Sequence, residues 1–204
     1  ITQACGSGTV YSLEEIQAIA AVAHSHGLSM HMDGARFANA LVTLDVTPAQ
    51  MTWQAGIDVL SFGGTKNGCL AAEAVVFFRP ELVGDFPFLQ KRAGQLLSKS
   101  RFISSQFAGY LKDGTWLRNA RQANAMAQRL SKGLAALPGI ELAYPTQSNE
   151  VFVSMPAVLI ERLSAQGLSV NDEELDGKAV RFVAAWNTPE SQVDDLLKVL
   201  ADHC

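Results

Sequence analysis

Asp58-Val-Leu-Ser-Phe-Gly-Gly-Thr-Lys-Asn-Gly-Cys69 is the stretch of the chain that says most about its fold. Residues 57–62 are mostly apolar, partly β-branched and few in number, as in a buried strand. Gly63 and Gly64 end that strand and favour a tight turn around Lys66. If the strand delivers this lysine into a dry site, burial favours the neutral amine, which is a nucleophile. Taken alone, however, a lysine in a loop is more often exposed to solvent.

A second motif, His24-Ser-His-Gly-Leu-Ser-Met-His-Met-Asp-Gly-Ala-Arg36, predicts a helix tail and then another short strand over residues 28–32. That strand places Asp33 at its carboxyl end, although an aspartate before a glycine is also a common turn former. A carboxylate and Lys66 at two strand ends, separated by one crossover, are two halves of one site. A pyridoxal phosphate enzyme needs both groups, because the amine holds the aldehyde carbon and the carboxylate keeps the pyridine nitrogen protonated.

Four segments of the chain resemble the low-specificity threonine aldolases, a group of fold-type I pyridoxal phosphate enzymes related to the β-eliminating lyases. They are Gly8-Thr-Val-Tyr-Ser-Leu-Glu-Glu-Ile16, His31-Met-Asp-Gly-Ala-Arg-Phe-Ala-Asn-Ala40, Ser61-Phe-Gly-Gly-Thr-Lys-Asn-Gly68 and Val180-Arg-Phe-Val183. The likeness covers nearly the whole chain and weakens after Leu137. It implies pyridoxal 5'-phosphate as cofactor, a small amino acid as substrate, and a homo-oligomer, either a dimer or a tetramer.

The resemblance also assigns roles to the charged residues of these motifs. It implies that Lys66 forms the Schiff base with the cofactor and that Asp33 contacts the pyridine nitrogen. Arg36 would lie at the cofactor rim, near the ring hydroxyl and the substrate carboxylate. Arg181 is a lone charge in the apolar stretch 179–183, where the family places its carboxylate clamp. Without the resemblance, a structural salt bridge would explain this arginine equally well.

Three further residues are candidates for the cofactor site. Thr65 could contact the phosphate or simply cap the turn. Lys99 belongs to a basic cluster whose members are expected mainly on solvated helix faces, but in the family a basic residue of this region meets the phosphate. His31 shares a face with Asp33 by alternation and could orient that carboxylate, or it could be a satisfied core histidine. His24 and His26 are expected to be exposed residues at a helix end.

Composition limits the classes of function. The chain has 204 residues, 48% of them hydrophobic and 18% charged, with a net charge of −4. It has no basic stripe, which argues against a nucleic-acid partner, and no apolar run of membrane-spanning length. Its three cysteines, Cys5, Cys69 and Cys204, form no metal-binding or redox spacing and suit a reducing cytoplasm. Cys69 is expected to be a small apolar residue rather than a nucleophile.

The alternation of short apolar strands with helices predicts an α/β fold with a mainly parallel sheet, helices on both faces and a smaller C-terminal α/β module. We expect residues 1–85 to be the C-terminal part of a large cofactor-binding domain, 86–137 a helical connection and 138–204 a small domain. The predicted strands are 28–32, 57–62, 74–78, 141–144, 151–155 and 179–185, and the predicted helices are 13–26, 86–110, 116–137, 157–166 and 189–201.

The chain opens at Ile1, already within a motif, and lacks the glycine-rich phosphate loop and ring-stacking side chain that the family carries upstream. We therefore expect it to be the C-terminal part of a longer polypeptide. The resemblance implies cleavage of threonine-like β-hydroxy-α-amino acids to glycine and an aldehyde, with a general base outside the identifiable residues. The alternatives are another fold-type I lyase or an aminotransferase and, in a different class, a catalytically incomplete fragment or structural subunit.

Overall fold

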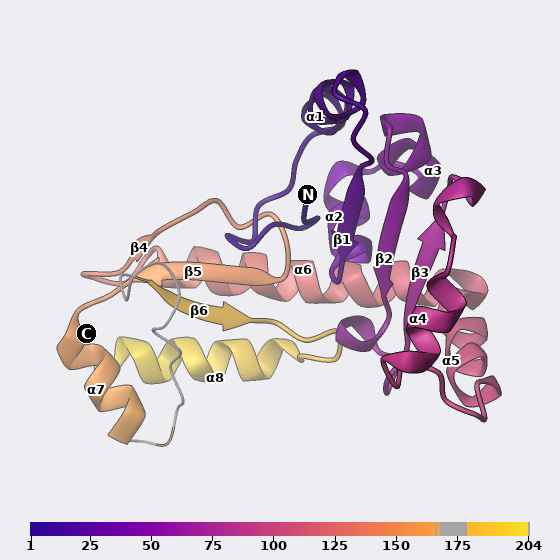
Figure 1. Ribbon diagram of the computed structural model, residues 1–204. Helices are drawn as coiled ribbons and strands as arrows, with labels where there is room; N and C mark the ends of the chain where they lie inside the picture. The colour runs from indigo at the N-terminus through magenta and orange to yellow at the C-terminus, as the bar shows by residue number, and fades with distance from the viewer. Residues whose placement is uncertain (166, 168–178, 204) are drawn as a thin grey trace. The chain divides into compact units, whose positions relative to one another are not determined.

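The computed structural model of the chain describes residues 1–165, 167 and 179–203. The chain packs into two compact units. The first comprises residues 1–4 and 11–118, and the second comprises residues 5–10 and 119–204. Within the described residues, each unit contains one three-stranded sheet (Figure 1).

The sheet of the first unit has the order β1-β2-β3, with β1 at His31–Gly34, β2 at Val59–Gly63 and β3 at Glu73–Phe77. Strands β1 and β2 are parallel, and Asp33 pairs with Ser61 in their register. The crossover between them runs through the helices α2 (Phe37–Leu44) and α3 (Pro48–Met51) and the 3₁₀ turn η1 (Trp53–Ala55). All three predicted strands are present, but β1 starts later than expected because Leu28 is exposed and burial begins at Met30.

Strand β3 departs from the mainly parallel sheet that the sequence predicts, because it runs antiparallel to β2. Only the 3₁₀ turn η2 (Thr65–Asn67) and a short loop lie between the two strands. A parallel connection needs a crossover of a dozen or more residues, so a connection this short must reverse the chain.

The helices of the first unit begin and end largely where the sequence signals predict. Helix α1 (Leu13–Ser25) opens with a capping box, in which the Glu15 amide donates to Ser12 Oγ at 3.2 Å and the Ser12 amide donates to Glu15 Oε2 at 2.8 Å. The region expected to be one helix over 86–110 is instead divided into α4 (Phe86–Arg92) and α5 (Arg101–Leu111). Gly94, with φ +72°, lies in the break. None of the described helices has the length and apolarity needed to cross a bilayer.

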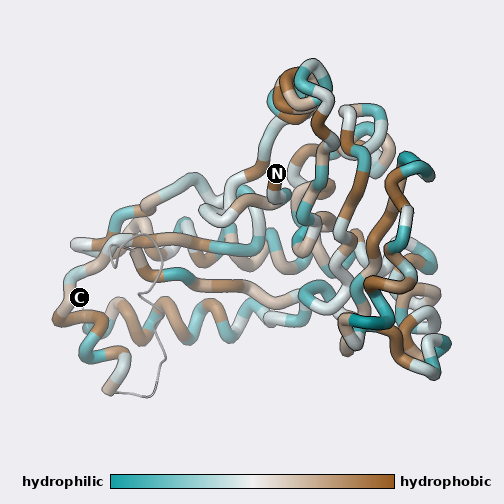
Figure 2. The backbone as a smooth tube through the Cα atoms, viewed as in Figure 1, coloured by the Kyte–Doolittle hydropathy of each residue, from teal (hydrophilic) through white to brown (hydrophobic). Residues whose placement is uncertain are grey.

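The second unit has an antiparallel sheet of order β4-β5-β6, with β4 at Glu141–Leu142, β5 at Glu150–Ser154 and β6 at Val180–Val183. Its helices are α6 (Thr115–Leu134), which begins in the first unit, α7 (Ala157–Ala165) and α8 (Glu190–Ala201). The predicted end of α7 at residue 166 lies outside the described residues. Hydrophobic and polar residues alternate along α8, as in a helix with one buried face (Figure 2). The core joins side chains of α6, β5, α7, β6 and α8, including Met126, Leu130, Leu134, Val151, Val153, Leu159, Leu163, Val180, Val193 and Leu200.

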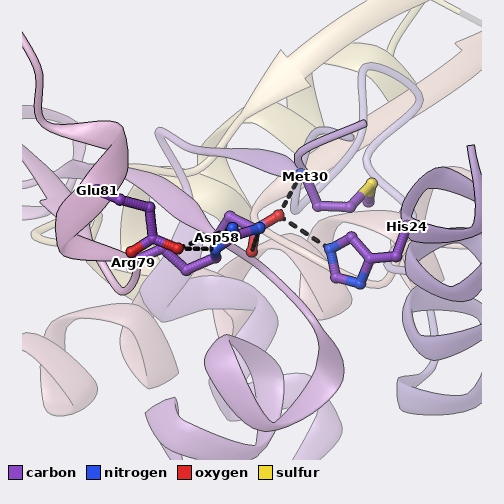
Figure 3. Close-up of polar contacts among 5 residues, drawn as sticks. All are labelled: His24, Met30, Asp58, Arg79 and Glu81. Atoms are coloured by element: carbon purple, nitrogen blue, oxygen red, sulfur yellow. Dashed lines mark hydrogen bonds and ion pairs between the residues drawn. The ribbon is translucent and has the colours of Figure 1, made fainter. Parts of the chain in front are cut away.

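A charged cluster holds the amino-terminal ends of β1 and β2 together (Figure 3). Asp58, which precedes β2, is only 4% exposed. Its Oδ2 accepts the Met30 amide at 2.7 Å and lies 2.9 Å from His24 Nε2 on α1. Its Oδ1 lies 3.6 Å from Arg79, which also pairs with Glu81 at 2.8 Å. His24 is an exposed helix-end residue, as predicted, with its side chain 40% exposed, and the fold also gives it a buried carboxylate 34 residues away.

The environment of Asp58 favours its ionised form. Burial alone raises the pKa of this carboxyl, but the Met30 amide, His24 and Arg79 together outweigh burial and lower it below its usual value. The folded state therefore binds fewer protons at Asp58 than the unfolded state. The stabilisation is present above the unfolded pKa and is lost as pH falls through the folded one, that is, below about pH 4.

Asp58→Asn should lower the free energy of unfolding at pH 7 by about 1.5–3 kcal/mol, the usual scale for hydrogen bonds to a charged group. Urea denaturation at pH 7 and at successively lower pH values would measure the difference from wild type, which should shrink as wild-type Asp58 becomes protonated. Glu81→Gln is the matched control, because its ion pair with Arg79 is exposed and screened by solvent, so that this variant should unfold with nearly the free energy of wild type. A difference between Asp58→Asn and wild type that does not change with pH would contradict this account.

Candidate active site

The parallel pairing of β1 and β2 brings Asp33 and Lys66 to one edge of the sheet. Asp33 is the third residue of β1, and its Oδ1 accepts the Ala35 amide at 3.0 Å. Lys66 follows the end of β2, within η2. Because the carboxyl ends of parallel strands meet at the same edge, Asp33 and Lys66 lie at the same edge of the sheet. This is the placement that the two motifs predict.

Three glycines allow the backbones at this edge to approach closely. A Cβ on Gly63 would lie 2.8 Å from Ala35 Cα, and one on Gly34 would lie 2.7 Å from the Ser61 carbonyl oxygen. A Cβ on Gly64 would lie 2.8 Å from the carbonyl oxygen of Ala72. Backbone atoms cannot move aside as a flexible side chain can. All three glycines are therefore required for the close approach of the backbones, a role beyond the strand end and the tight turn that the sequence predicts for Gly63 and Gly64.

The η2 turn carries Lys66 outward. Thr65 and Lys66 are exposed, whereas Asn67 is buried. The expectation of a dry site around Lys66 is therefore not met by this chain's own residues, because burial along β2 ends with the two glycines and the turn then leaves the core. Thr65 caps the turn: its Oγ1 accepts the Ala72 amide at 3.1 Å, and its own amide donates to Glu73 Oε1 at 3.2 Å.

Asn67 anchors this turn, a role that the sequence patterns do not indicate. It is 3% exposed, and its Nδ2 donates to Tyr110 Oη at 2.7 Å and to the Trp116 carbonyl at 2.8 Å. Phe62 packs beside the anchor, with its ring 6.1 Å from Tyr110 and 5.9 Å from Trp116. Burial raises the pKa of Tyr110 to about 12, even though the bond from Asn67 lowers it, so the phenol stays protonated at neutral pH. The only local sign of this anchoring role in the sequence is that a polar residue directly follows Lys66.

The other candidates of the first unit are placed as follows. His31 is exposed, so the interpretation as a core histidine is wrong, and its Nε2 lies 2.8 Å from Ser61 Oγ rather than from Asp33. Arg36 is partly buried at the start of α2, where its carbonyl accepts the amides of residues 39 and 40. Lys99 is exposed between α4 and α5.

Cys69 is partly buried and free, and burial, with a smaller contribution from Glu73, raises the pKa of its thiol. A raised pKa disfavours the thiolate that a nucleophilic cysteine needs. Cys69 Sγ instead fills space beside Gly64, where an added Cβ would lie 2.9 Å from the sulfur. These observations favour the packing role over the catalytic one.

Arg181 belongs to the second unit, where β6 places it beside Glu150. Its Nη1 lies 3.6 Å from Glu150 Oε1, and the two side chains are 27% and 1% exposed respectively. Arg181 therefore has Glu150 as the partner for the structural salt bridge that the sequence left open as an alternative. A guanidinium carries five N–H donors, so pairing with one carboxylate does not by itself exclude binding of another.

Comparisons with known proteins identify the family of the chain. The family model described as beta-eliminating lyase matches residues 1–157. The low specificity L-threonine aldolase of Pseudomonas sp. (strain NCIMB 10558) is 48% identical over 96% of this chain, which covers 56% of that relative. The corresponding protein of Saccharomyces cerevisiae (strain ATCC 204508 / S288c) is 26% identical over 84% of the chain, covering 44% of the relative. The chain thus spans about half the length of these two curated relatives.

Solved structures confirm the fold class. A threonine aldolase from Leishmania major superposes with a TM-score of 0.88 at 29% identity, covering 100% of this chain and 60% of that one. A tryptophan decarboxylase from Catharanthus roseus superposes with a TM-score of 0.70 at 18% identity, covering 99% of this chain and 50% of that one. The second likeness concerns the fold alone. Both are consistent with the fold-type I architecture that the sequence predicts.

Gly63→Ala should destabilise the first unit by about 1–3 kcal/mol, because the new methyl group meets the Ala35 backbone and must push β1 and β2 apart. Thermal and urea melts would measure the loss. Gly109→Ala is the matched control: it lies within α5, and an added Cβ there has no neighbour within 4 Å. The control should leave stability unchanged or raise it, since alanine has a higher helix propensity than glycine. Equal melting temperatures for the Gly63 variant and wild type would contradict the close strand contact.

Proposed function

The chain belongs to the beta-eliminating lyase family, and on that premise we propose that it carries out aldol cleavage of β-hydroxy-α-amino acids such as threonine and allo-threonine, giving glycine and an aldehyde. The observation that carries the proposal is the placement of Asp33 and Lys66 at the same edge of a sheet, Asp33 within β1 and Lys66 in the turn that follows the neighbouring parallel strand β2. The aldolases that the chain resembles supply the reaction type. The activity is proposed because the chain spans only part of their length.

The residues at this edge fit pyridoxal 5'-phosphate as cofactor. The set contains a primary amine on an exposed turn and a carboxylate at the end of the neighbouring parallel strand. When bound, pyridoxal phosphate supplies an electron sink for the pair of electrons left when a bond to the substrate's α-carbon breaks. Lys66 would hold its aldehyde carbon, and Asp33 would accept a hydrogen bond from its pyridine nitrogen. The Ala35 amide, which donates to Asp33 Oδ1 at 3.0 Å, fixes the direction of that carboxylate.

We assign the substrate carboxylate to Arg36 and Arg181, because a guanidinium can bind a carboxylate through two parallel hydrogen bonds. Thr65 and Lys99 are proposed as phosphate contacts and His31 as a neighbour of the ring. Support for these three comes from the family motifs and from their exposure, which leaves them accessible to a ligand.

We also propose that the protein is a cytoplasmic homo-oligomer, a dimer or a tetramer. Exposed apolar side chains gather on α4, α5 and the segment between them, where Phe88 is 76% exposed and Phe102 is 59% exposed. Large exposed apolar groups of this kind are typical of association surfaces. Multi-angle light scattering would give the oligomer mass.

Cys5 and Cys69 are free thiols, which supports the proposed cytoplasmic location, because the cytoplasm is a reducing compartment.

The reaction is tested by incubating the protein with pyridoxal phosphate and L-threonine or L-allo-threonine, and by measuring acetaldehyde and glycine in equal amounts. Asp33→Asn should depress kcat by roughly a hundredfold, the scale of losing one preorganised electrostatic contact. Borohydride should fix the cofactor selectively on the peptide that contains residue 66, and Lys66→Ala should abolish this selective fixation. Formation of a 2-oxo acid in place of glycine would identify a β-eliminating enzyme or an aminotransferase, and no turnover by wild type would leave the chain as an incomplete or structural part.

Arg181→Lys should raise the KM for threonine roughly ten- to a hundredfold with a normal cofactor spectrum, because an ammonium cannot reproduce the two parallel hydrogen bonds. Arg181→Leu, compared with wild type in a thermal melt, distinguishes the two roles. If the arginine serves only to neutralise buried Glu150, its removal leaves that carboxylate without its counter-charge and lowers the melting temperature. A destabilised Arg181→Leu protein, together with an unchanged KM in Arg181→Lys, would remove Arg181 from the substrate site.

A further inference from the structure

We propose that Asn67 is a positioning residue for Lys66: its buried carboxamide ties the η2 turn to α5 and α6 and so fixes the direction in which the lysine leaves the sheet. The inference rests on the proposed role of Lys66 as the cofactor lysine. It adds a residue whose contribution is mechanical, since Asn67 faces the core while Lys66 faces solvent.

The geometry of the turn explains why the lysine needs such an anchor. An exposed side chain on a three-residue turn is not held by packing around it, so its direction depends on the backbone. A 3₁₀ turn has three residues per turn, and successive side chains therefore point about 120° apart. If Asn67 is fixed in the core, the direction of the Lys66 Cα–Cβ bond is fixed with it. The Gly64 carbonyl closes the turn by accepting the amides of Asn67 and Cys69, each at 3.1 Å.

The contacts of Asn67 are long-range and specific. Its Nδ2 donates to Tyr110 Oη at 2.7 Å and to the Trp116 carbonyl at 2.8 Å, so one amide group bridges two helices. A carbonyl within a helix already accepts the amide four residues further on, so α6 does not need this bond to satisfy Trp116. The bond therefore serves to hold the turn.

The acceptors are themselves held in place. Tyr110 is 4% exposed, and its ring lies 6.4 Å from that of Phe107 and 6.2 Å from that of Trp116. Phe62, one residue before the glycines of β2, stacks on Phe107 at 5.6 Å. Aromatic rings packed in this way have few alternative rotamers. Asn67 is thus bonded to a rigid aromatic cluster, and Lys66 directly precedes Asn67 in the turn.

The experiment measures how selectively Lys66 captures pyridoxal phosphate. Wild type and variants are incubated with pyridoxal phosphate and cyanoborohydride, and mass spectrometry compares labelling of Lys66 with labelling of the exposed reference lysines Lys112 and Lys198. Asn67→Leu removes both donated hydrogen bonds at similar size and should reduce the preference for Lys66 roughly ten- to a hundredfold, the cost expected for about 1 Å of misplacement. Tyr110→Phe removes one acceptor only and should give a smaller loss.

Asp58→Asn is the matched control, because it destabilises the same strand at its other end and should leave the preference for Lys66 unchanged. For the active enzyme, Asn67→Leu should lower kcat with little change in the KM for threonine. A general loss of folded protein would also lower the apparent kcat, so the labelling ratio is the measurement that decides. A preference for Lys66 that stays at the wild-type value in Asn67→Leu, or in Tyr110→Phe if the first variant does not fold, overturns the inference. If wild-type Lys66 is labelled selectively but no aldehyde forms from threonine, the proposed reaction is overturned. The labelling ratio then still tests the role of Asn67.

Discussion

The parallel pairing of β1 with β2 is the constraint on which the first unit depends. It is possible only because Gly34 and Gly63 carry no Cβ where the two backbones meet. The pairing gives the sheet two ends with different chemistry. At the amino-terminal end, Asp58 is buried and held by hydrogen bonds and ion pairs. At the carboxyl end, Asp33 and Lys66 remain accessible enough to meet a ligand. Stability and proposed chemistry are thus separated along the same two strands.

Much of this arrangement follows from local sequence patterns. The short apolar run that ends in two glycines predicts β2, and the Ser12 and Glu15 capping box predicts the start of α1. The positions of Asp33 and Lys66 follow because the end of a strand is set by residues next to it in sequence, and because neighbouring parallel strands share an edge. Fold class was predictable for the same reason, since strand–helix alternation is a local pattern with few topological solutions.

What the sequence could not supply depends on residues far apart along the chain. His24 meets Asp58 34 positions away, and Asn67 meets Tyr110 43 positions away; neither pair has a local signature. The reversal of β3 escaped prediction because an apolar strand reads the same in either direction, and only the shortness of its connection decides. Arg181 was ambiguous for a related reason: a lone arginine in a strand demands a partner, but its own sequence does not say whether that partner is Glu150 or a ligand.

The exposure of Lys66 changes how precision must be achieved at the proposed site. In a dry pocket, close packing would select one rotamer of the lysine and favour its neutral form at once. On an exposed turn, these two requirements separate. Backbone geometry must aim the side chain, which is the role that the bonds from Asn67 to Tyr110 and Trp116 can fill. The electrostatic requirement of the proposed site then falls on the groups that a bound cofactor would bring with it and on Asp33 in the neighbouring strand. If Lys66 has the proposed role, the aromatic cluster that holds the turn would affect the chemistry without touching the reacting groups, because any loosening of Tyr110 or Trp116 would reach Lys66 through Asn67.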